Sequence, residues 1–139
     1  MPSIENSIYR KHILKKLEFR FGEFYLCKDF IVSEVYEGFV FGVEEATQVV
    51  DESVAYYNKM ELFHKKLYIA NRIHKYSVKP TGWLKFGHLR KYLYGYCVVD
   101  DTQHGVMSAI LESKFVPIAF KSVTSLGDAI DWALKRQMK

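Results

Sequence analysis

Short apolar runs alternate along this chain with segments of helical periodicity, and this alternation most constrains what it can fold into. The runs at residues 66–71, 94–99 and 116–120 are almost wholly apolar, as buried strands are. Between and after them, apolar residues recur at spacings of three and four, which is typical of amphipathic helices. Strand–helix alternation of this kind favours a largely parallel sheet with right-handed crossovers.

The first third of the chain follows another pattern. Leu17, Phe19 and Phe21 alternate with charged residues, which indicates a half-buried strand ended by Gly22. Apolar runs at 23–27 and 30–36 flank a Lys-Asp pair that suits a tight turn. We therefore predict an α/β fold with a mixed sheet, in which an N-terminal antiparallel meander precedes βα units with about four helices.

The first helix is expected after Gly42, with two glutamates in its first turn, where carboxylates complement the helix dipole. Its predicted buried stripe is Val43, Ala46, Val50, Val54 and Tyr57. A second helix is predicted over 81–93 with Thr81 as its N-cap.

A third helix is predicted to begin at Thr102, burying Val106, Ala109 and Ile110. Ser125 and Asp128 form a variant capping box for the last helix. That helix is expected to bury Leu126, Ala129, Ile130, Ala133 and Leu134. Pro117 predicts that the final strand lies at an edge or begins near this residue.

The length of 139 residues favours one domain, which we place at residues 15–139 after an N-terminal arm at 1–14. No window approaches the roughly 20 apolar residues of a membrane span, and the first sixteen residues lack the apolar stretch of a signal peptide. We therefore expect a cytoplasmic protein. Cys27 and Cys97 each lie in an apolar run and are predicted to be buried free thiols.

Charge and aromatic content leave several classes of ligand open. The net charge is +4, but the cations are spread along the chain in runs no longer than two. Aromatic residues make up 16% of the chain. Their rings either build a core or provide stacking surfaces for bases or sugars. Because neither cations nor aromatics are clearly concentrated on one face, this pattern argues against nucleic-acid binding.

No catalytic or metal-binding constellation is recognisable. The chain has no glycine-rich phosphate loop, no Gly-x-Ser-x-Gly elbow and no Cys-x-x-Cys pair, and its five histidines are scattered. Asp100 and Asp101 end a predicted strand, but adjacent residues of an extended chain point apart, and Asp before Thr102 is ordinary helix-start chemistry. We therefore expect a protein that is not an enzyme and needs no metal or cofactor.

The segment 71–83 is the most distinctive in the sequence, because it joins a buried strand to a helix N-terminus and is rich in cations. Free N–H groups at such a terminus suit an anion, and aromatic side chains could form an apolar wall. The alternative is a surface loop with solvated cations. The candidate partner-binding or anion-binding residues are Asn71, Arg72, His74, Lys75, Tyr76, Lys79, Thr81, Gly82 and Trp83.

Residues 30–41, 66–86, 94–100 and 116–132 resemble the STAS-like superfamily. The stretch 68–85 resembles small stand-alone bacterial proteins, of Bacteroidetes type, grouped with the sporulation anti-anti-sigma factor. The CRAL-TRIO lipid-transfer fold is a related architecture. This resemblance implies a regulatory or scaffold module that docks a protein partner through the 71–83 loop and the helix after it.

The resemblance also implies a phosphorylation switch at the start of that helix, where a phosphate would add about −1.5 to −2 charges. The matching hydroxyl is Thr81, with Ser77 as the other candidate, although this chain has Lys-Pro-Thr-Gly where the family has Asp-Ser-Ser-Gly. The alternative hypothesis for the function is a small-ligand module that binds a lipid, a nucleotide or another anion. A homodimer is also expected, because the meander must end in a free strand edge.

Overall fold

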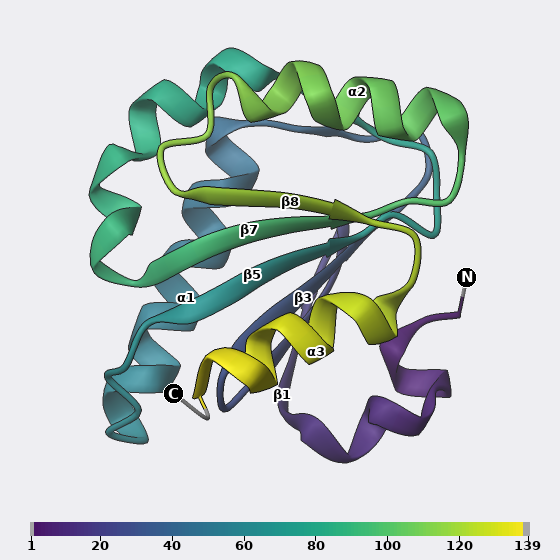
Figure 1. Cartoon of the computed structure of the whole chain (residues 1–139). Helices are drawn as coiled ribbons and strands as arrows, with labels where there is room; N and C mark the ends of the chain where they lie inside the picture. Colours follow the sequence, from purple (N-terminus) through teal and green to yellow (C-terminus); the bar gives the residue numbers. More distant parts are fainter. Residues whose placement is uncertain (1, 138–139) are drawn as a thin grey trace.

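The computed structural model describes residues 2–137 and has one mixed six-stranded sheet with helices on both faces (Figure 1). The sheet strands are β1 (Ile13–Phe19), β2 (Gly22–Cys27), β3 (Phe30–Val35), β5 (Lys66–Asn71), β7 (Leu93–Val99) and β8 (Ala119–Val123). The helices are α1 (Val43–Lys59), the 3-10 helix η3 (Pro80–Lys91), α2 (Gln103–Ser113) and α3 (Leu126–Gln137). Two short 3-10 turns, η1 (Ile4–Asn6) and η2 (Ile8–His12), open the chain, and β4 (Val40–Phe41) pairs with β6 (Ser77–Val78).

The predicted fold class is confirmed. Strands β1, β2 and β3 pair antiparallel, whereas β3, β5, β7 and β8 pair parallel, in the order β1-β2-β3-β5-β7-β8. Strand β8 lies at one edge, as Pro117 predicted, and begins two residues after it. Gly22 opens β2, where a Cβ atom would come within 2.8 Å of the Glu34 carbonyl oxygen.

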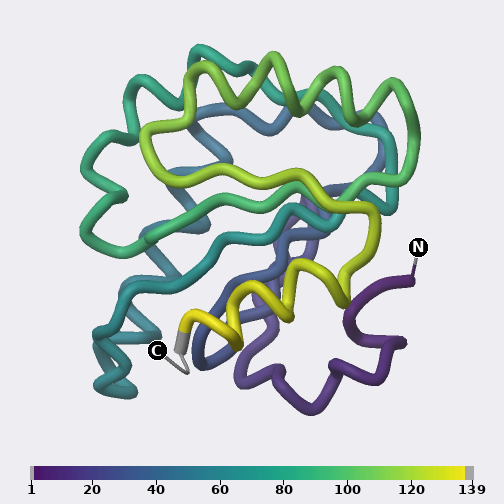
Figure 2. Tube along the Cα trace, viewed as in Figure 1, coloured from purple at the N-terminus to yellow at the C-terminus, as the bar shows by residue number. Residues whose placement is uncertain are grey.

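One face of the sheet is covered by α3 and the opening turns, which lie side by side (Figure 2). Ile130, Ala129 and Ala133 of α3 are fully buried there, as predicted. Ile4 is also fully buried in this core, so the segment predicted as an arm packs onto the sheet. Both cysteines lie in this core as buried free thiols, in agreement with the sequence.

The other face is covered by α1, η3 and α2. The stripe of α1 faces the sheet, with Val49 and Tyr57 buried and Ala46 and Val50 half-buried. In α2 the predicted buried face of Val106, Ala109 and Ile110 is wrong by part of a turn. Gly105, Ala109 and Glu112 are the buried residues, and Ile110 is exposed.

The predicted cap at Thr81 is also wrong. The N-cap is Lys79, and Pro80 takes the first helical position, since its fixed φ suits helix entry. The resulting helix is 3-10 with non-helical backbone angles at Phe86, and Thr81 is exposed in its first turn. None of the helices described here is long and apolar enough to cross a membrane.

Candidate functional site

The structure separates the predicted site residues into three groups. Asn71 turns toward the α3 face, where its Nδ2 donates to Glu34 Oε2 at 3.1 Å. Arg72 turns toward the α1 face instead, because neighbouring strand residues point to opposite sides. The exposed group consists of His74, Lys75, Ser77, Lys79 and Thr81, and Gly82 is half-buried beside them.

A cavity of about 350 Å³ lies between the sheet and the helices α1 and η3. Its walls are mostly apolar, and its size falls at the lower end of ordinary small-molecule sites. Side chains of the strands and of both helices line it, among them Ile31, Val49, Tyr57, Tyr68, Trp83 and Phe86. Trp83 and Tyr76 are thus the predicted site residues that line it, together with Lys79 and Gly82.

A buried polar network forms one end of this cavity. The Arg72 guanidinium donates to Glu112 Oε2 and, at 3.0 Å, to the Tyr96 hydroxyl. Glu112 Oε1 accepts from Trp83 Nε1 at 3.0 Å and from the Tyr96 hydroxyl at 2.8 Å. Both side chains of the ion pair are nearly inaccessible, at 9% for Arg72 and 3% for Glu112.

The titration of this network follows from its surroundings. Burial alone would lower the pKa of Arg72, but Tyr96, Tyr76 and Glu112 together raise that pKa above its ordinary value. Burial raises the pKa of the Tyr96 hydroxyl well above its ordinary value. The Tyr96 hydroxyl therefore stays protonated near pH 7, and the contact between Arg72 and Glu112 lets the two side chains offset each other's charge.

Few other polar groups face the cavity. Ser53 of α1 lines it, and the Ser53 Oγ is buried without a hydrogen-bond partner among the described residues. Lys66 lies at the opposite end from Arg72, where its Nζ donates to the carbonyls of Leu62 at 2.7 Å and His64 at 2.6 Å. Burial lowers the pKa of Lys66. An apolar cavity with a few fixed polar groups can bind and orient a small molecule.

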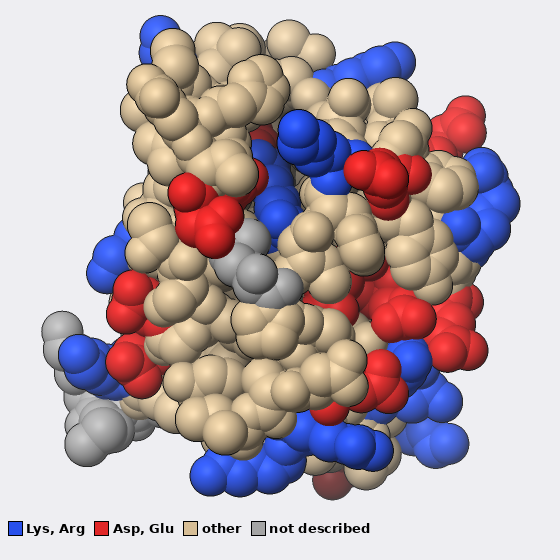
Figure 3. Space-filling view, turned by 90° about the vertical axis from the view of Figure 1, so that its right-hand side faces the viewer, with Lys and Arg blue, Asp and Glu red and all other residues tan. Residues whose placement is uncertain are grey.

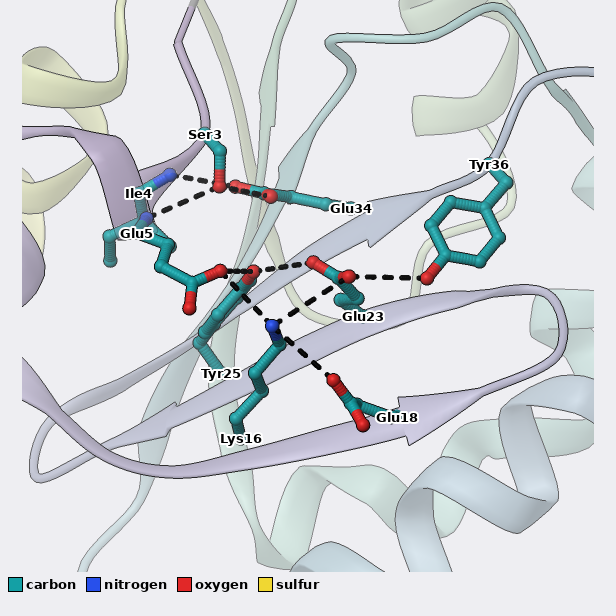
Figure 4. A network of polar contacts seen from close by, with 9 residues as sticks. All are labelled: Ser3, Ile4, Glu5, Lys16, Glu18, Glu23, Tyr25, Glu34 and Tyr36. Atoms are coloured by element: carbon teal, nitrogen blue, oxygen red, sulfur yellow. Dashed lines mark hydrogen bonds and ion pairs between the residues drawn. The ribbon is translucent and has the colours of Figure 1, made fainter.

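A second polar cluster lies on the α3 face and fastens the opening turns (Figure 4). Glu34 is 3% exposed and accepts from Ser3 Oγ at 2.6 Å and from the Ile4 amide at 2.8 Å. Beside it, Lys16 pairs with Glu5 at 3.1 Å, and the Tyr25 hydroxyl donates to Glu23 at 2.7 Å. Acidic side chains gather on the corresponding side of the molecule (Figure 3). Since neighbouring donors satisfy these carboxylates, the cluster has a structural role, and no metal-binding group of three or more ligands occurs within 2–137.

Sequence reasoning missed three residues of the cavity. Glu112 was not singled out, although it continues the line of Gly105 and Ala109 on α2, where a charged residue is unusual. Tyr68 and Tyr96 were taken as strand residues only, yet their rings lie 5.6 Å apart on the cavity side of the sheet.

Comparison with known proteins gave no match to a family model, a curated protein or a solved structure. The site must therefore be interpreted from its geometry.

Proposed function

We propose that this protein is a small-ligand binding module that takes a mainly apolar molecule into the cavity between the sheet and the helices α1 and η3. The observation that carries the proposal is the cavity itself: about 350 Å³, open to the surface and lined mainly by aliphatic and aromatic side chains. Concave, mostly apolar cavities of this size with a few polar groups are typical of small-molecule sites.

The polar groups narrow the chemistry of that ligand. Because Arg72 and Glu112 neutralise each other, this end of the cavity offers no net charge to a phosphate. The Ser53 hydroxyl and the rim near Lys66 could hydrogen-bond one polar group of the ligand. The cations among the lining residues are Lys79 and Lys91, which are exposed at the rim, and Lys66, which already donates to two carbonyls. Chain-like alcohols and carboxylic acids, which carry one polar group on an apolar chain, therefore fit these mostly apolar walls better than nucleotides with their several charges.

The test compares two substitutions on α1. Ala46→Phe places a ring in the cavity, whereas Ala55→Phe places the same ring on the exposed side of the helix. Isothermal titration with straight-chain alcohols and carboxylic acids from octyl to dodecyl should show binding to the wild type and to Ala55→Phe, and none to Ala46→Phe. Equal binding by all three proteins, or binding by none, would refute the proposal.

A second candidate, a regulatory module that docks a protein partner, is supported by exposed apolar side chains on η3 and α2. Leu84 is 70% exposed, three residues after the exposed Thr81, and Ile110 is 55% exposed on the helix that contacts η3. Pull-down with wild type, Thr81→Glu and the double variant Leu84→Ser/Ile110→Ser tests it. A partner captured by the wild type and lost from the serine variant would support docking, and loss from Thr81→Glu as well would support a phosphorylation switch. Capture of the same proteins by all three forms would refute both.

A further inference from the structure

The amino edge of the parallel strands collects the C-terminal ends of α1, η3 and α3, because each of these helices runs back along the sheet (Figure 1). The last turns of the three helices carry Lys59, Arg90, Lys91, Lys135 and Arg136. Lys65 and Lys28 add two exposed cations in the connections at this edge. Cations at helix C-termini complement the helix dipole, which explains part of this arrangement.

The helix dipole does not explain the large apolar side chains exposed between these cations. Phe63 is 69% exposed, Met60 is 50% exposed and Tyr92 is 40% exposed. The two connections that carry them are adjacent, since the Lys66 amide donates to the Tyr92 carbonyl oxygen at 2.9 Å. We call Lys59, Met60, Phe63, Lys65, Lys91 and Tyr92 the basic-aromatic rim.

This rim is also the mouth of the cavity. Phe63, Lys91 and Tyr92 line the cavity while remaining exposed to solvent, so the cavity reaches the surface between them. The carboxylates in these connections and in the adjacent β2–β3 turn are Glu61 and Asp29, and Asp29 is already paired with His64 at 3.0 Å. The rim therefore presents a net positive charge together with exposed aromatic and thioether groups.

We propose that the basic-aromatic rim docks on the surface of an anionic bilayer, a proposal that rests on the proposed function. The mouth of the cavity then opens toward the lipid from which its ligand comes. Lysines are attracted by anionic headgroups, and amphipathic side chains such as Tyr lie favourably at the headgroup level. Phe63 and Met60 would enter the acyl boundary beside them, as apolar residues of interfacial segments do. The attraction weakens with salt, because the surface potential is screened within about 8 Å at physiological ionic strength.

The test is co-sedimentation of the full chain with phosphatidylcholine vesicles, with and without phosphatidylglycerol. We expect the wild type to bind the anionic vesicles at least about tenfold more tightly than the neutral ones, since each lysine near the surface contributes on the order of 1 kcal/mol. Phe63→Ser/Tyr92→Ser and Lys59→Gln/Lys65→Gln/Lys91→Gln should both lose this binding. The matched controls are Val40→Ser/Met107→Ser and Arg20→Gln/Lys75→Gln/Lys121→Gln, which remove exposed groups of the same kinds away from this edge and should bind like the wild type.

Equal loss in the control variants, or no preference for anionic vesicles, would overturn the docking proposal. If the rim docks a protein instead, the rim substitutions should leave vesicle binding unchanged. That result would also overturn the proposal that the rim docks on a bilayer. The cavity is tested separately: Ala46→Phe should still bind vesicles while losing the soluble octyl alcohol. If the wild type binds that alcohol but no vesicles, the ligand-binding function stands and the rim proposal falls.

Discussion

The two faces of the sheet differ in how closely they are covered. On one face, Ala129, Ile130 and Ala133 bring α3 against the strands, and each of these residues is 0% exposed. On the other face, α1 and η3 leave about 350 Å³ between themselves and the sheet. The same strands therefore support a closed core on one face and an open cavity on the other.

The cause lies in the covering helices rather than in the sheet. Alanines on α3 allow its backbone to approach the strands, whereas the large side chains of Tyr57 and Phe86 are buried under α1 and η3 on the other face. The irregular backbone at Phe86 also prevents η3 from lying along the sheet as one regular helix. The comparison teaches that cavity formation is decided by a few side chains at the helix–sheet contact.

The cavity face contains a buried ion pair between Arg72 and Glu112, and breaking it should have the largest effect on stability. Glu112→Ala leaves the Arg72 cation buried without a counter-charge, so it should lower the free energy of unfolding by about 3–5 kcal/mol. The exposed control Glu52→Ala should change it by less than about 0.5 kcal/mol. Urea denaturation measures both, and a small loss for Glu112→Ala would show that the ion pair is not formed.

Truncating one aliphatic side chain on each face should then cost different amounts. Ile130→Ala opens a hole in the closed face and should cost about 2–5 kcal/mol. Val50→Ala, on the wall of the existing cavity, should cost less, because the side chain is only half-buried. Similar losses in thermal or urea denaturation would contradict the difference in packing.

Adding volume should again cost more on the closed face than on the cavity face. Ala133→Leu overpacks the closed face and should cost about 1–3 kcal/mol. Ala46→Leu places the same atoms in the cavity and should be neutral or slightly stabilising. A comparable cost for both leucines would mean that the cavity is filled or collapsed in solution.

The last contrast concerns the thiols of the closed face, whose ionisation has no effect on stability near neutral pH and matters only at high pH. Burial raises the pKa of Cys27 and of Cys97 from 9.0 to about 12. The folded state thus favours the neutral thiol: this contribution to stability is complete below pH 9 and is lost as the pH rises to about 12. The free energy of unfolding of the wild type should fall more steeply over this range than that of Cys27→Ala/Cys97→Ala, and parallel pH profiles would contradict burial of the thiols.

The fold could be predicted from sequence because its signals are local. Two-residue alternation marked the meander, and helical spacing marked α1 and α3. The cavity could not be predicted, since it depends on how far α1 stands from the sheet. Glu112 was missed because the buried face of α2 is set by Gly105, which passes the Asp100 side chain where no Cβ would fit, and not by the apolar Ile110.

The 71–83 segment was identified for its cations, yet only part of it reaches the cavity. Tyr76, Lys79, Gly82 and Trp83 line the cavity and Arg72 contacts Tyr76 behind them, while His74, Lys75 and Thr81 stay at the surface. Strand alternation explains why the Arg72 side chain points inward, but the sequence does not reveal that Glu112 of α2 pairs with it. Regulation through Thr81 or Ser77, and homodimer formation, stay predictions.

The most direct test of the claim that one face of the sheet holds a ligand-binding cavity is a titration of alanine-methyl-labelled protein with octyl alcohol. The titration is followed by two-dimensional NMR. Ala46 and Ala70 line the cavity, and Ala129 and Ala133 lie in the closed core. The methyl signals of the first pair should shift with saturation while those of the second pair stay fixed. Shifts spread over both pairs, or absent from all four, would contradict the account.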